Sequence, residues 1–317
     1  MEIIVKYFDQ EIREQVRVFL ENLVHELAHN TPNKLKLDAL EYIIIAEDFG
    51  EEVVNFQRER NLKEGYTNDS FGRAYGKNIL YKSKDNKLKT SVILDGSLVS
   101  NLFLDDEKDL RQQAIHLIHH ELCHSHDENL KSEMMGIEAV LKDRGNLEEL
   151  SMIHADNIWS EYIANRYSSY TMPGNHDLYA SYLIKMITEI KELNDDFISK
   201  YREHGDIDQL FGEIQIHSAK LLYYTGTVLG YIHGHEWKET KVKQIIDKTI
   251  AETYFAEMWR EIEIELSNLH DIYGAWEGFD QFKTLGDCVL RTWNLMGIFP
   301  EEHDNGRLYI GVPRTDY

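Results

Sequence analysis

The hydrophobic positions in the first third of the chain follow two different periods. Between residues 10 and 30 the apolar side chains, including Val16, Leu20 and Val24, recur at helical spacing and predict an amphipathic helix. The run LEYIIIAED is short, β-branched and bounded by polar clusters, which indicates a buried strand. The runs AYGKNILYKS and KLKTSVILDGSLV flank the polar turn KSKDNK and predict a β-hairpin.

Helical periodicity dominates the rest of the chain. One predicted helix buries Leu110, Ala114, Ile118 and Leu122. A second helix, in SMIHADNIWSEYIANRYSSY, carries apolar and aromatic residues at helical spacing. From about Asp177 onward the pattern is mainly helical, with a strand signal only in GRLYIGV near the end. The pattern therefore predicts an α+β chain with two domains, at residues 1–175 and 176–317.

Composition is that of a soluble globular protein. Hydrophobic residues make up 42% and charged residues 28% of the chain, as in ordinary globular proteins. The length of 317 residues is ample for a core that excludes water. The formal net charge of −22 has the wrong sign for binding phosphate backbones, so we expect no nucleic-acid partner. No segment has the length and apolarity of a membrane span or a secretory signal. Because Cys123 and Cys288 form no metal-binding pair or disulfide framework, we expect a cytoplasmic protein.

The most specific motif is His120-Glu121-Leu122-Cys123-His124. Residues four apart lie on one face of a helix, so the two imidazoles can converge on one metal ion. Glu121 lies beside them, where a carboxylate can take a proton from a metal-activated water. This combination is typical of zinc hydrolases.

A second copy of the motif, His25-Glu26-Leu27-Ala28-His29, competes for the same function. Beyond it the chain passes through Pro32 into the predicted strand, where no acidic residue has a helical setting. The first copy is followed by a helix that carries Glu161. We therefore expect the metal site at the copy that ends in His124, and ordinary, partly exposed polar positions at His25 and His29.

A catalytic zinc usually has three protein ligands and one open position. Glu161 is the predicted third ligand, and His154 and Asp156, on the same helix, are its rivals. Asn165 lies one turn after Glu161, where its amide can hydrogen-bond a ligand histidine. His116, one turn before His120, is a further candidate for such a supporting contact, although a structurally satisfied histidine is the alternative.

The segment from about Leu40 to Tyr170 resembles gluzincin-type zincin metallopeptidases. The pairing of HHELCH with EYIANRY is most similar to the ImmA/IrrE-type peptidases. The resemblance implies a zincin-like catalytic domain with a small mixed or antiparallel sheet and active-site helices, followed here by the helical half. Thermolysin-like relatives usually carry aspartate where this chain has Asn165.

These residues predict a metallopeptidase with one Zn²⁺ per chain, held by His120, His124 and Glu161, and with Glu121 as general base. Its substrate would be a peptide or protein. The strand KTSVILD is either a platform for an extended substrate or a covered interior strand. Charge that develops on the substrate oxygen also needs a stabilising donor. The candidates near the third-ligand helix are Tyr162, Arg166, Tyr170 and His176.

Two other functions fit the same residues. The metal site can serve an amidase that acts on a small molecule or a modified peptide. Alternatively, the chain is a catalytically inactive zincin scaffold whose helical half binds a protein. Resemblance to ImmA/IrrE-type peptidases also implies a partner that triggers the activity, and the helical half is the candidate region for binding a regulatory protein. The histidines of GYIHGHEW, His233 and His235, are two apart and are expected at the surface of a turn.

Overall fold

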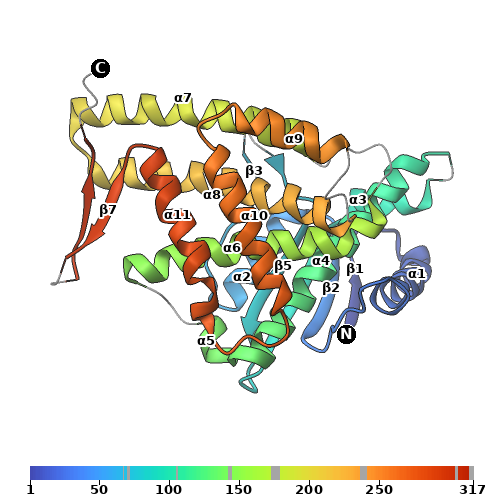
Figure 1. Ribbon diagram of the computed structural model, residues 1–317. Coiled ribbons are helices and arrows are strands. Elements are labelled where there is room, and N and C mark those ends of the chain that lie inside the picture. The colour runs from blue at the N-terminus through green and yellow to red at the C-terminus, as the bar shows by residue number, and fades with distance from the viewer. Residues whose placement is uncertain are drawn as a thin grey trace. The chain divides into compact units, whose positions relative to one another are not determined.

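The computed structural model describes residues 1–66, 68–69, 72–104, 106–141, 145–172, 179–235, 241–303 and 306–313. It combines many helices with short strands, so the predicted α+β class is confirmed (Figure 1). By internal contacts the chain forms two compact units. The first comprises Met1–Leu141 and Ile163–His176, and the second comprises Lys142–Tyr162 and Asp177–Tyr317. The segment Lys142–Tyr162, which we assigned to the first domain, thus groups with the second unit.

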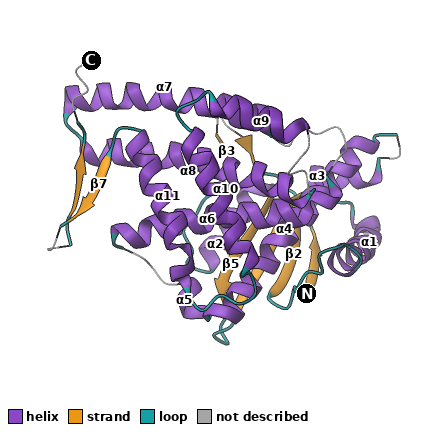
Figure 2. Ribbon diagram, viewed as in Figure 1, coloured by secondary structure: helices purple, strands orange, loops and turns teal. Residues whose placement is uncertain are grey.

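The first unit is built on a four-stranded mixed sheet, drawn in orange in Figure 2. Its strand order is β1-β2-β6-β5, in which β1, β2 and β6 are parallel and β5 runs antiparallel to β6. The predicted buried strand and the predicted hairpin are both confirmed. The strand β1 was not predicted, because four residues carry too short a pattern. The strands are β1 (Glu2–Val5), β2 (Leu40–Ala46), β5 (Gly76–Lys82) and β6 (Leu88–Asp95).

Helices cover both faces of this sheet. On β2, Ile43 and Ile45 join a core formed with α1 (Gln10–His29) and α4 (Lys108–Met135). Ile44 and Ala46 point to the opposite face and pack against α2 (Phe49–Glu59). Successive strand residues alternate between faces, so a strand buried on both sides needs the continuous apolar run seen in the sequence.

The remaining elements of the first unit are short. They are β3 (Asn68–Asp69), β4 (Gly72–Arg73), α3 (Gly96–Ser100), η1 (Asn101–Phe103), α5 (Ile137–Leu141) and η2 (Ser169–Thr171). The helix α6 (Leu147–Ser168) is continuous across the division between the units, so its last turn belongs to the first unit and its earlier turns to the second.

The second unit is mainly helical, as the sequence predicts. Its helices α7 and α8 pack against each other, and α11 contacts both α8 and α10 (Figure 1). The predicted strand near the chain end is β8, which pairs with β7 in an antiparallel hairpin. The elements are α7 (Ala180–His204), α8 (Ile207–Gly234), α9 (Lys241–Ala251), α10 (Ala256–Asp271), η4 (Phe279–Phe282), α11 (Lys283–Leu295), β7 (Phe299–Glu302) and β8 (Leu308–Gly311).

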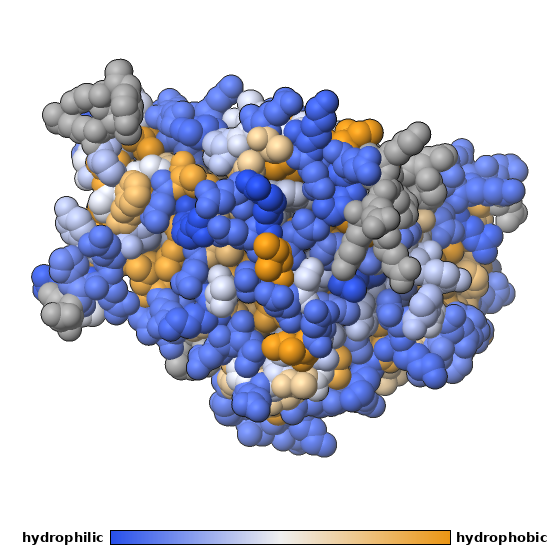
Figure 3. All heavy atoms as spheres, in the orientation of Figure 1, coloured by the Kyte–Doolittle hydropathy of each residue, from blue (hydrophilic) through white to orange (hydrophobic). Residues whose placement is uncertain are grey.

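The face drawn in Figure 3 is mostly hydrophilic, and hydrophobic residues reach it as separate spots. This agrees with the high charged fraction of the sequence. Within the described part of the chain, no helix has both the length and the apolarity that crossing a bilayer requires.

Candidate metal centre

The helix α4 brings two half-buried imidazoles together. The Nε2 atoms of His120 and His124 are 3.0 Å apart, and their ring centroids are 4.6 Å apart with the rings perpendicular. Tetrahedral zinc with bonds of 2.0–2.1 Å places two nitrogen ligands about 3.3 Å from each other. The pair therefore presents its nitrogens at nearly the separation that one zinc ion requires.

Glu161 supplies an oxygen to the same place. One ligand atom from each of His120, His124 and Glu161 lies within 4.8 Å of the other two. Two imidazole nitrogens and one carboxylate oxygen are the ligand set of many catalytic zinc sites. It is the single group of three or more His, Cys, Asp or Glu donors found among the described residues, and it includes neither His154 nor Asp156.

The last turns of α6, which follow Glu161, pack against α4. Ala164 belongs to the core cluster that contains Leu122 and Cys123 of α4. The ring of Tyr167 lies 5.5 Å from the ring of His126, also on α4. Because an α-helix rises 1.5 Å per residue, Glu161 lies about 4.5 Å along α6 from Ala164. These contacts hold the last turns of α6 against α4 within the first unit.

The carboxylate of Glu121 is buried against the first residue of β5. A Cβ atom added at Gly76 would lie 2.8 Å from Glu121 Cγ and 2.9 Å from Glu121 Oε1. One turn later on α4, Ser125 Oγ donates a hydrogen bond of 3.1 Å to Asn78 Oδ1, two residues further along β5. The helix and the strand therefore hold each other in register, and only glycine at position 76 leaves Glu121 its space.

We expect Gly76→Ala to lower the free energy of unfolding by about 1–3 kcal/mol, because the added methyl group overlaps Glu121. In a Glu121→Ala background the same change should cost almost nothing, since the overlapping atoms are gone. Denaturant unfolding of the four proteins of this double-mutant cycle measures the difference. Equal costs in both backgrounds would show that Gly76 does not constrain Glu121.

The other predicted site residues have different surroundings. His116 Nδ1 and His119 Nδ1 lie 3.2 and 3.0 Å from Thr171 Oγ1, so both rings hold η2 against α4. Burial lowers the pKa of His119 to about 4, which keeps that ring neutral. Asn165 is buried on α6, one turn after Glu161, where its predicted supporting contact stays a prediction.

The predicted transition-state donors also differ in exposure. Tyr162 is fully buried, and its hydroxyl lies 2.8 Å from His233 Nδ1. Arg166 is half-buried, and Tyr170 is 63% exposed in η2. His176 lies outside the described residues.

The prediction of a surface turn at His233 was wrong. The helix α8 continues to Gly234, and His233 is buried at its last turn. Its Nε2 lies 3.3 Å from Glu263 Oε1, and Lys243 Nζ lies 3.2 Å from the same oxygen. A carboxylate at Nε2 makes that nitrogen the proton donor, so Nδ1 accepts the hydrogen bond of Tyr162.

Sequence analysis missed a group of tyrosines in the second unit. The rings of Tyr182 and Tyr224 are 4.6 Å apart, and Tyr179 stacks on Tyr231 with centroids 6.2 Å apart. Burial, neighbouring tyrosines and the carboxylate of Glu161 all raise the pKa of Tyr224. The neutral phenol of Tyr224 is therefore close enough to Glu161, the candidate third ligand, to interact with it electrostatically. The adjacent tyrosines at 223 and 224 were the available signal.

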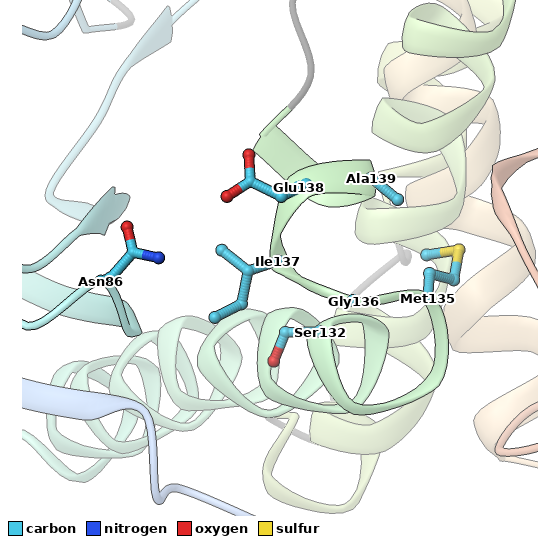
Figure 4. A pocket seen from close by; sticks show the side chains of 7 residues that line it. All are labelled: Asn86, Ser132, Met135, Gly136, Ile137, Glu138 and Ala139. Atoms are coloured by element: carbon cyan, nitrogen blue, oxygen red, sulfur yellow. The ribbon is translucent and has the colours of Figure 1, made fainter.

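The cavity of about 460 Å³ in Figure 4 lies elsewhere. It lies at the C-terminal end of α4, and its lining includes Ser132, Met135, Ile137 and Asn86 of the β5–β6 turn. In Figure 4 the side chain of Ile137 points toward Asn86, whereas Met135 lies on the side away from it. None of the three candidate metal ligands lines this cavity. The donor geometry on α4 and α6, rather than a cavity, defines the candidate site.

No family model, curated protein or solved structure matches this chain.

Proposed function

We propose that this protein is a zinc-dependent metallopeptidase with one Zn²⁺ per chain. The observation that carries the proposal is the convergence of ligand atoms from His120, His124 and Glu161 within 4.8 Å, with Glu121 adjacent to the first of them. A purely structural zinc usually has four protein ligands, whereas this set has three and leaves one position for water.

Zinc held there would lower the pKa of a coordinated water and polarise the scissile carbonyl group. Glu121 accepts a proton from the attacking water and passes it to the amine that leaves. Its burial against Gly76 restricts the carboxylate to one place, which favours proton transfer at a fixed atom. No serine or cysteine nucleophile is required, and Cys123 suits none, because burial raises its pKa well above the usual value.

The architecture of the first unit supports a zincin-like fold. The mixed sheet and the HExxH helix of this unit occur in the expected order along the chain, and they are followed in the sequence by α6, which carries Glu161. Of the two alternatives for KTSVILD, the interior strand is the one observed, because β6, which contains this segment, lies between β2 and β5. Among the described strands β5 is the edge of this sheet next to Glu121, so we propose that a peptide or protein substrate lies along β5.

A cytoplasmic location and the absence of a nucleic-acid partner belong to the same proposal. They are supported by the net charge of −22 and by two cysteines that are both free and buried. The same proposal includes a regulatory protein partner that binds the helical half.

Removal of the metal tests the proposal. We expect the zinc-loaded protein to cleave members of a peptide library, treatment with a chelator to abolish cleavage, and one equivalent of Zn²⁺ to restore it. Mass spectrometry of the library detects the products. Zinc bound at one equivalent with no library member cleaved would contradict the peptidase and favour an amidase or a binding scaffold.

A further inference from the structure

The second HExxH copy also brings two imidazoles together. On α1 the ring centroids of His25 and His29 are 4.7 Å apart, with 61° between the ring planes. The corresponding centroid distance in the candidate metal centre is 4.6 Å. Spacing along the helix thus produces the same convergence of rings at both copies.

The opposite face of α1 is fixed in the core, which keeps the two histidines at the surface. Val24, Leu27 and Ala28 are buried in the cluster that α1 shares with the sheet, whereas His25 and His29 are exposed. A rotation of α1 that hid the histidines would expose those three apolar side chains. The glutamate of the motif has another contact, because Asn30 Nδ2 donates a hydrogen bond of 2.7 Å to Glu26 Oε2.

We propose that His25 and His29 form a second, exposed binding site for a divalent transition-metal ion. Imidazole is a good ligand for Zn²⁺, Cu²⁺ and Ni²⁺ and a poor one for Mg²⁺ and Ca²⁺. Two nitrogens from one helix face are its protein ligands, and water fills the other positions. This site does not depend on the proposed peptidase activity.

The two sites should differ in their affinity for metal, because they offer different numbers of protein ligands. No third His, Cys, Asp or Glu donor joins His25 and His29 among the residues that the structure describes. With one protein ligand fewer, the α1 site should bind Zn²⁺ on the order of 10²-fold more weakly than the site on α4 and α6. The affinity order should be Cu²⁺ above Ni²⁺ above Co²⁺, as nitrogen ligands dictate.

Titration of the full-length, metal-free chain with Zn²⁺ alone tests the proposal. Isothermal calorimetry should resolve one tight and one weaker equivalent. His25→Ala and His29→Ala should each remove only the weaker one, and His124→Ala should weaken only the tight one. In the His124→Ala protein, electron paramagnetic resonance of one added equivalent of Cu²⁺ should show nitrogen ligands that His29→Ala then removes.

His303→Ala is the control for a single exposed histidine, and should leave both equivalents unchanged. Circular dichroism verifies that each variant is folded. A weaker equivalent that persists in both α1 variants, or its absence from the unaltered protein, would overturn the proposal. Neither result bears on peptide cleavage, so the proposed activity is tested separately.

Discussion

Replacing Glu121 with glutamine should reduce kcat/KM for peptide cleavage by about 10²–10⁴-fold, the usual contribution of a general base. Glutamine fills nearly the same volume against Gly76, so the fold and the metal ligands should be retained. The loss should appear mainly in kcat, because the proton acceptor acts in the transition state. Steady-state kinetics on the best library peptide, together with zinc analysis of each protein, measure both effects.

Glu26→Gln is the matched control, since it makes the same change in the other HExxH copy. Glu26 is exposed and accepts a hydrogen bond from Asn30, so this variant should cleave the peptide at the rate of the unaltered protein. A Glu121→Gln protein that keeps its zinc and its full activity would eliminate Glu121 as the base. If instead the zinc is lost as well, then Glu121 supports the ligands directly.

Glu161→Ala should lower the affinity for Zn²⁺ at the tight site by roughly 10²–10³-fold, because it removes one of three protein ligands. Cleavage at limiting zinc should fall with it and recover partly when zinc is added in excess. Competition with a chromogenic chelator measures the affinity.

Asn157→Ala is the control on the same helix, one turn before Glu161 and exposed. It should leave the zinc affinity unchanged. Equal affinities for the unaltered and the Glu161→Ala proteins would mean that the third ligand is another residue, and the proposed site would then be wrong in its most distinctive part.

Local patterns predicted the parts of this fold that depend on local spacing. The helices that carry His120, His124 and Glu161 follow from their apolar periodicity, and so does the buried strand β2. The site residues could be proposed because two histidines four apart must share a helix face. The sequence could not decide whether β6 is an edge or an interior strand, since its position depends on parallel pairing with a strand more than forty residues away.

The environment of each site residue needed the three-dimensional structure. Gly76 precedes Glu121 by 45 positions, and nothing local to either one indicates their contact. His233 seemed to belong to a turn because His235 follows it closely, yet α8 extends past it and Glu263 of α10 supplies a buried partner. Polar residues in a core are predictable only together with their partners, which come from distant segments.

The central claim is that one zinc ion is bound by side chains of α4 and α6. Anomalous scattering at the zinc absorption edge from a crystal of the zinc-loaded protein tests it most directly. We predict that the strongest peak lies about 2.0–2.2 Å from the Nε2 atoms of His120 and His124 and from a carboxylate oxygen of Glu161. A strongest peak that is bonded to other residues, with the Glu161 carboxylate beyond bonding distance of the metal, would contradict the account.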